Sequence, residues 1–146
     1  MRHKLLAEDA GERAFILVMD TGEEAFSSIS TFANEQGIAA ASVTAIGAFQ
    51  SATIAFFEVE TKEYRNIHVD EQSEALSLMG DVAIADDGSA SLHLHAVLGL
   101  SDGSTRGGHF VQGQVRPTLE VVIRETPARL RRKHRRDLGL ALIDLD

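Results

Sequence analysis

The amino-acid sequence predicts an α+β protein in which one main helix packs on a mostly antiparallel β-sheet. Three observations lead to this fold class. One segment has apolar residues at helical spacing, most of the remaining chain consists of alternating or near-continuous apolar runs of strand length, and Asp/Gly-rich turns separate those runs. The length of 146 residues fits a single domain, 1–146.

The predicted helix follows a buried strand over residues 13–20. Thr21 and Glu24 have the spacing of a capping box, which predicts that the helix begins here. Gly37 predicts where it ends, because glycine readily takes the left-handed conformation that closes a helix. The apolar residues of the helix recur every three or four positions: Phe26, Ile29, Phe32 and Ala33.

After this helix the sequence predicts strands up to residue 124. The candidate strands are 40–46, 52–59, 64–69, 75–85, 91–100, 109–114 and 118–124. Residues 86–88 and 101–104 have the composition of turns. Thr126 and Pro127 predict a short helix through the basic residues that follow.

Composition excludes several classes of site and of protein. The chain has no cysteine, which excludes disulfides, thiolate zinc sites and cysteine nucleophiles. It has neither a P-loop nor a dinucleotide-binding glycine pattern. Its apolar stretches are too short to span a membrane, and its first residues turn acidic before a signal-peptide core can form. We therefore expect a cytoplasmic protein with no membrane partner.

The charge of the chain is uneven. The net charge is −8, yet residues 124–146 carry seven Lys and Arg against four Asp and Glu. Arg131, Arg132 and Lys133 are the centre of this basic segment and are candidates for contacts with DNA phosphates. Two alternatives are a solvated helix face, and a segment that docks on the acidic body of the same or a neighbouring subunit.

Two histidines are the strongest candidates for a metal site. Residues 91–99 alternate, so that His93 and His95 lie on the face opposite the leucines. Two histidines at positions i and i+2 of one strand can converge on one ion, and neutral imidazole is a common zinc ligand. The alternative is an exposed or hydrogen-bonded pair that binds no metal.

His109 can complete this site only in one register of the predicted hairpin. A two-residue turn at 102–103 pairs Ala96 with His109 and places that histidine on the leucine face. A shift of one residue pairs His95 with His109 and gathers all three histidines on one face. The metal hypothesis therefore predicts a bulge at Gly107 and Gly108, or an odd-length loop between residues 99 and 108.

Three histidines leave an open coordination position, as in catalytic zinc sites. A zinc-dependent enzyme is therefore one alternative function, with Arg106 and Arg116 as candidate clamps for an anionic substrate. Its general base is undetermined, since Glu71, Glu74 and Glu120 are only available candidates. A protein that binds a small ligand or serves structure alone is the other alternative.

Several segments in order resemble the prokaryotic PPC (plants and prokaryotes conserved) domain proteins. The resemblance lies in His93-Leu94-His95-Ala96, Gly107-Gly108-His109 and residues 115–123, and extends to residues 46–49 and 139–142. It implies a PPC-like α+β fold that assembles as a homotrimer. It also implies zinc or another divalent metal at His93, His95 and His109, and a DNA-binding or DNA-associated role. The chain lacks the Arg-Gly-Arg-Pro AT hook of the plant members, so that DNA role rests on the relationship alone.

Overall fold

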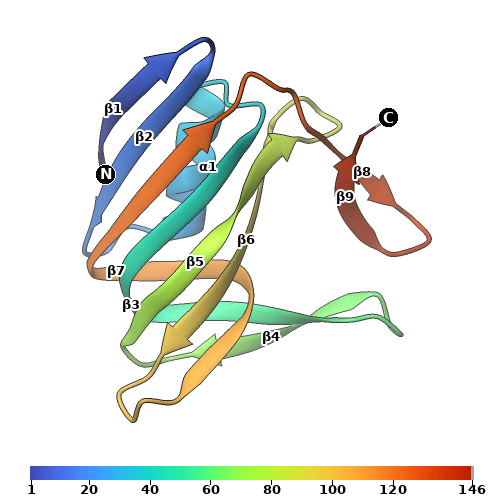
Figure 1. Ribbon diagram of the computed structural model, residues 1–146. Helices are drawn as coiled ribbons and strands as arrows, with labels where there is room; N and C mark the ends of the chain where they lie inside the picture. The colour runs from blue at the N-terminus through green and yellow to red at the C-terminus, as the bar shows by residue number, and fades with distance from the viewer. Residues whose placement is uncertain (146) are drawn as a thin grey trace.

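The computed structural model describes residues 1–145, which form a strongly curved sheet with one helix on its inner face (Figure 1). The elements are β1 (Arg2–Asp9), β2 (Glu12–Asp20), α1 (Ala25–Glu35), β3 (Ala41–Glu58), β4 (Glu63–Val69), β5 (Ser73–Ile84), β6 (Ala90–Gly99), β7 (Thr105–Glu125), β8 (Arg131–Arg135) and β9 (Leu140–Asp144). The fold is mostly β-sheet with one short helix, so α+β describes it only approximately. No helix within the described residues is long and apolar enough to cross a membrane.

The two longest strands organise the sheet. β3 and β7 pair antiparallel from Ala41↔Glu125 to Ala55↔His109, and both strands curve. On its other side, β3 pairs first with β5 and then with β4. On its other side, β7 pairs first with β6 and then with β2. The sheet runs in the order β1-β2-β7-β3-β5-β8-β9, with β4 added to β3 and with β6 between β5 and the first half of β7. Each long strand merges two strands that the sequence predicts separately.

The core lies between the inner face of the sheet and α1. Buried side chains alternate along the strands, as the sequence predicts, so that Leu94 and Leu98 of β6 point into the core. The apolar stripe of α1 packs on them, and the ring of Phe32 lies edge to face with that of Phe15 of β2, with the ring centroids 5.2 Å apart. The residues between these positions form the outer face of the sheet.

The helix begins about one turn later in the chain than predicted. Glu24 is the N-cap, and its carboxylate accepts hydrogen bonds from the backbone N–H groups of Phe26 and Ser27. Thr21, the predicted cap, instead donates its hydroxyl to the carbonyl of Pro117 at 3.1 Å. The predicted capping box is therefore wrong, because the longer Glu24 side chain reaches the helix end from a strand-like backbone. The predicted end is confirmed, with Gly37 at φ 64°.

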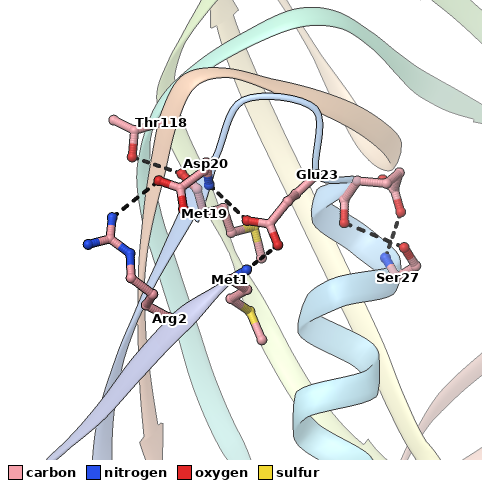
Figure 2. Close-up of polar contacts among 8 residues, drawn as sticks. Met1, Arg2, Met19, Asp20, Glu23, Ser27 and Thr118 are labelled. Atoms are coloured by element: carbon pink, nitrogen blue, oxygen red, sulfur yellow. Dashed lines mark hydrogen bonds and ion pairs between the residues drawn. The ribbon is translucent and has the colours of Figure 1, made fainter.

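The first strand was not predicted, and polar contacts hold its start beside the helix (Figure 2). β1 is exposed along its whole length and has no apolar alternation, as is usual for a charged edge strand. The Met1 amino group forms an ion pair with Glu23, and Arg2 pairs with Asp20 at 3.2 Å. Such a strand is recognised from its neighbour β2 and not from its own sequence pattern.

The C-terminal segment is a β-hairpin and not the predicted helix. β8 and β9 pair from Arg131↔Asp144 to Arg135↔Leu140, and the hairpin projects from one side of the sheet. β9 is the pairing partner of β8. The prediction of a helix over the basic residues gave no role to this apolar segment. Strand geometry sends alternate basic side chains to opposite faces, so Arg132 faces away from Arg131 and Lys133.

Candidate metal centre

The β6–β7 connection has the register that the metal hypothesis requires. Gly99 pairs with Thr105, which leaves a five-residue loop over 100–104, and the following pairs run regularly to His95↔His109. Gly103 has φ 82° and donates its N–H to the Leu100 carbonyl at 2.9 Å. The predicted odd-length loop is confirmed, and Gly107 and Gly108 pair without a bulge.

This register brings His93, His95 and His109 together on the outer face of the sheet. The ring centroids are 5.1 Å apart for His93–His95, 5.1 Å for His93–His109 and 5.6 Å for His95–His109. One nitrogen from each ring lies within 4.8 Å of the others, so the three form a group able to hold a metal ion. His95 is exposed, whereas the other two are half-buried.

Two glycines allow the strands around the triad to approach closely. A Cβ at Gly80 of β5 would lie 1.8 Å from the carbonyl oxygen of His93, and a Cβ at Gly108 would lie 2.6 Å from that of Ala55. Both distances are far below van der Waals contact. The backbones that carry His93 and His109 therefore depend on glycine at these positions.

Tyr64 forms one wall of the site. Its ring lies 4.6 Å from the ring of His109, centroid to centroid. The two residues belong to β4 and β7, on opposite sides of β3, and they meet above the small side chain of Ala55, which is 1% exposed. No pattern in the sequence of either strand indicates this contact, since it depends on three strands lying side by side.

An ion pair forms the opposite wall. Asp81 of β5 pairs directly with His93 in the sheet, and its carboxylate accepts a hydrogen bond from Arg132 of β8. Arg132 is 6% exposed and also donates to the carbonyl and the hydroxyl of Ser91, each at 3.4 Å. Asp81 is a functional neighbour that sequence reasoning missed, because strand pairing alone places it beside His93.

The environment keeps two of the histidines neutral. Burial of its imidazole lowers the pKa of His109 to about 4, and the charges of His93 and His95 act in the same direction. Burial also lowers the pKa of His93, as does the nearby Arg132, while Asp81 opposes that effect. Neutral imidazole is the form that binds a metal ion, so the site favours the ligating state.

The donor set fits a divalent transition metal such as zinc. Nδ1 of His109 is buried and has no hydrogen-bond partner among residues 1–145, which is unfavourable for a polar atom. A metal ion bound by Nδ1 of His109 would give this nitrogen a partner. Three imidazoles around one ion leave room for water or another ligand, the arrangement found in catalytic zinc sites.

The candidate substrate clamps lie on β7, and the candidate DNA contacts lie on β8. Of these five residues, Arg132 lies beside the triad, where it donates to Asp81, the neighbour of His93. Its side chain is buried. Arg106 lies near the start of β7 and donates to the His68 carbonyl at 3.5 Å, while Arg116 is exposed in the middle of that strand. Arg131 and Lys133 are exposed on the C-terminal hairpin.

The lowered pKa values predict a pH-dependent stability of the metal-free protein. Between the ordinary histidine pKa of about 6.5 and the value of about 4 for His109, the unfolded chain binds a proton that the folded chain does not. Stability should therefore fall as the pH is lowered through this window, by at most ~1.4 kcal/mol per pH unit for this group. Urea unfolding at pH 7, 6 and 5 measures the slope. His109→Gln should flatten it, and an unchanged slope in that variant contradicts the prediction.

Comparisons with known proteins agree with this fold. A model of the Plants and Prokaryotes Conserved (PCC) domain matches residues 6–127. A plant- and prokaryote-conserved protein from Pyrococcus horikoshii is 31% identical, with a TM-score of 0.84 over 98% of this chain and 94% of that one. A metal-containing protein from Archaeoglobus fulgidus is 32% identical, with a TM-score of 0.83 over 98% of both chains.

A third solved structure is a candidate DNA-binding protein from Bacteroides thetaiotaomicron. It is 27% identical, with a TM-score of 0.86 over 97% of this chain and 96% of that one. The search of curated proteins finds no match. The family model covers most of the chain, and the two relatives above 30% identity match over nearly their whole length. The chain therefore belongs to the Plants and Prokaryotes Conserved (PCC) domain family.

Proposed function

We propose that this protein is a metal-binding oligomeric domain in which His93, His95 and His109 hold a zinc ion or another divalent metal. The observation that carries the proposal is the convergence of one nitrogen from each ring to within 4.8 Å of the others. The Archaeoglobus relative is described as metal-containing, which supports the same reading. The open coordination positions leave room for a small ligand at the metal.

Elemental analysis of the purified protein tests this proposal. Inductively coupled plasma mass spectrometry should find about one equivalent of divalent metal per chain, or one equivalent of zinc after reconstitution of the chelator-treated protein. Competition with a chromogenic chelator then gives the zinc affinity. Protein that takes up no metal by either route contradicts the proposal.

DNA association is a second candidate function, and the exposed cations of the C-terminal hairpin favour it. The Bacteroides relative is a candidate DNA-binding protein. Arg131 and Lys133 lie on the same face of β8 and are exposed. Lys133 forms an ion pair with Asp144 and Arg135 pairs with Asp137, which leaves fewer cations for phosphates than the six of residues 129–136.

Salt-dependent binding to duplex DNA tests this candidate. We expect the wild type to bind a short fluorescent duplex at low salt. Arg129→Ala/Arg131→Ala, which removes two exposed cations of this segment, should weaken binding and lower the slope of log K against log salt by about 2. Fluorescence anisotropy measures both quantities. Lys4→Ala/Arg124→Ala removes two exposed cations elsewhere and should leave the slope unchanged. Equal loss in both double variants would show only a general charge effect.

We further propose that the domain forms a homotrimer through the outer face of the sheet. Ile46, Leu76, Met79 and Val97 form an apolar patch on this face, and their exposed fractions are 63%, 55%, 55% and 41%. They belong to the neighbouring strands β3, β5 and β6. Ile46, Leu76 and Met79 line a hollow of about 370 Å³, and exposed apolar areas of this kind are typical of association surfaces.

Sedimentation equilibrium tests the trimer and its interface. The wild type should have three times the mass of one chain, whereas Ile46→Asp and Leu76→Asp should shift it toward one chain, since each would bury a charge in an apolar contact. Val59→Asp is a matched control, because Val59 is 72% exposed and lies outside the patch, in the turn that follows β3. A trimer that survives both patch variants would exclude this face as the interface.

A further inference from the structure

A second polar site lies on the outer face where β4, β3 and β7 run side by side. Thr53 of β3 pairs with His68 of β4 on one side and with Gln112 of β7 on the other. A register shift between Thr53 and Ile54 turns Gln112 to the same face as His109. Successive residues on one face of a strand are about 7 Å apart, so this row lies one step along β3 from the row of His109.

The row encloses a small cavity of about 120 Å³. Its lining includes Ser51, Thr53, His68, Asp70, Gln112 and Gln114. Thr53 forms the floor and is 4% exposed. Its hydroxyl oxygen lies 3.2 Å from Nδ1 of His68 and accepts a hydrogen bond from the Gln112 side chain at 3.4 Å. These contacts fix the side chains of His68 and Gln112 on either side of the buried Thr53 hydroxyl. Such fixed polar side chains distinguish the cavity from an accidental surface depression.

The charge of the cavity selects its ligand. Asp70 is the one carboxylate in the lining, and no Lys or Arg among the described residues lines it. Arg106, whose guanidinium donates to the His68 carbonyl at 3.5 Å, is not among the lining residues. The amide oxygens of Gln112 and Gln114 add acceptors. A group with several donors and a positive charge therefore suits the cavity, and an anion does not.

We propose that this cavity binds the primary ammonium group of a small molecule or of a lysine side chain, with Asp70 as its counter-ion. The volume equals that of about four water molecules, which accommodates an ammonium group and a few methylenes. The buried Thr53 hydroxyl and the two glutamine side chains accept hydrogen bonds from the ammonium protons. The site is distinct from the histidine triad and does not require a metal.

Titration with three probes of one chain length tests the charge preference. Butylamine should perturb the backbone NMR signals of Thr53, His68 and Gln112, and should bind about fivefold more tightly than 1-butanol, the gain expected for one solvent-accessible ion pair. Butyrate should not bind there. Lysine with its α-amino and carboxyl groups blocked distinguishes a lysine side chain from a free small molecule as the natural ligand. If it binds more tightly than butylamine, the ligand is a lysine of a protein.

Matched variants and metal removal complete the test. Asp70→Asn should remove the preference for butylamine over 1-butanol, whereas Asp86→Asn, an exposed turn carboxylate, should keep it. The preference should be the same with and without zinc, and His95→Ala should retain it even where zinc binding is lost. Butylamine binding that requires zinc, that equals butanol binding, or that survives Asp70→Asn unchanged would overturn the proposal and leave the metal site unaffected.

Discussion

Replacement of His109 by alanine is expected to lower the zinc affinity of the protein at least ~100-fold. His109 supplies one of three converging nitrogens, and its backbone is held in register by the five-residue β6–β7 loop. Loss of one ligand leaves two histidines on a single strand, which hold an ion less tightly than three. Chelator competition at pH 7 measures the change, and His93→Ala should have a similar effect.

The control is a histidine outside the triad. His134 lies exposed on β8, and His134→Ala should bind zinc as the wild type does. Circular dichroism should show the same secondary structure for His109→Ala as for the wild type, since the alanine leaves a half-buried position without a clash. Zinc affinity that falls equally in the His134 and His109 variants would contradict the assignment of the site.

The substitution Gly80→Ala is expected to destabilise the folded protein by about 3 kcal/mol or more, because the added Cβ would lie 1.8 Å from the His93 carbonyl oxygen. Relief of that clash requires separation of β5 from β6, which carries His93 and His95. The free energy of unfolding from urea denaturation measures the loss. The folded fraction of the variant should also bind zinc more weakly than the wild type, since both histidines move with β6.

Gly99→Ala is the matched control for this prediction. The three atoms nearest its Cβ would all belong to the Leu76 side chain, the closest at 3.0 Å, and that side chain is exposed and can move. We expect a change of less than about 1 kcal/mol, as for an ordinary strand substitution. Equal destabilisation by the two alanines would show that the close approach at Gly80 is not the cause.

The local pattern of the sequence was sufficient for most elements of the fold. A near-continuous apolar run located β2, and further strand-length apolar patterns located β4, β5 and β6 within a few residues. Helical spacing with Gly37 located α1 and its end. The same alternation placed His93 and His95 together, away from the leucines, since a strand has a period of two whatever surrounds it. These features depend on neighbours in the chain, and a sequence reports them directly.

Elements without such a pattern required the tertiary structure. β1 is exposed throughout, and β8 and β9 contain few buried residues, so their pairing partners decide their conformation. The basic segment illustrates the consequence. As a helix it would present one cationic face, whereas as a strand it buries Arg132 against Asp81 and exposes Arg131. Long-range pairing outweighed local helix signals there.

By itself, then, the sequence determined the inner and outer faces of β6, the family resemblance and two of the three candidate ligands. The resemblance also implied the third, His109, but only the tertiary structure showed that it joins His95, because the β6–β7 loop sets a register that alternation leaves open by one residue. The tertiary structure also decided the surroundings of the site. Tyr64 and Asp81 reach the histidines across neighbouring strands, and such contacts arise from sheet order and not from spacing along the chain.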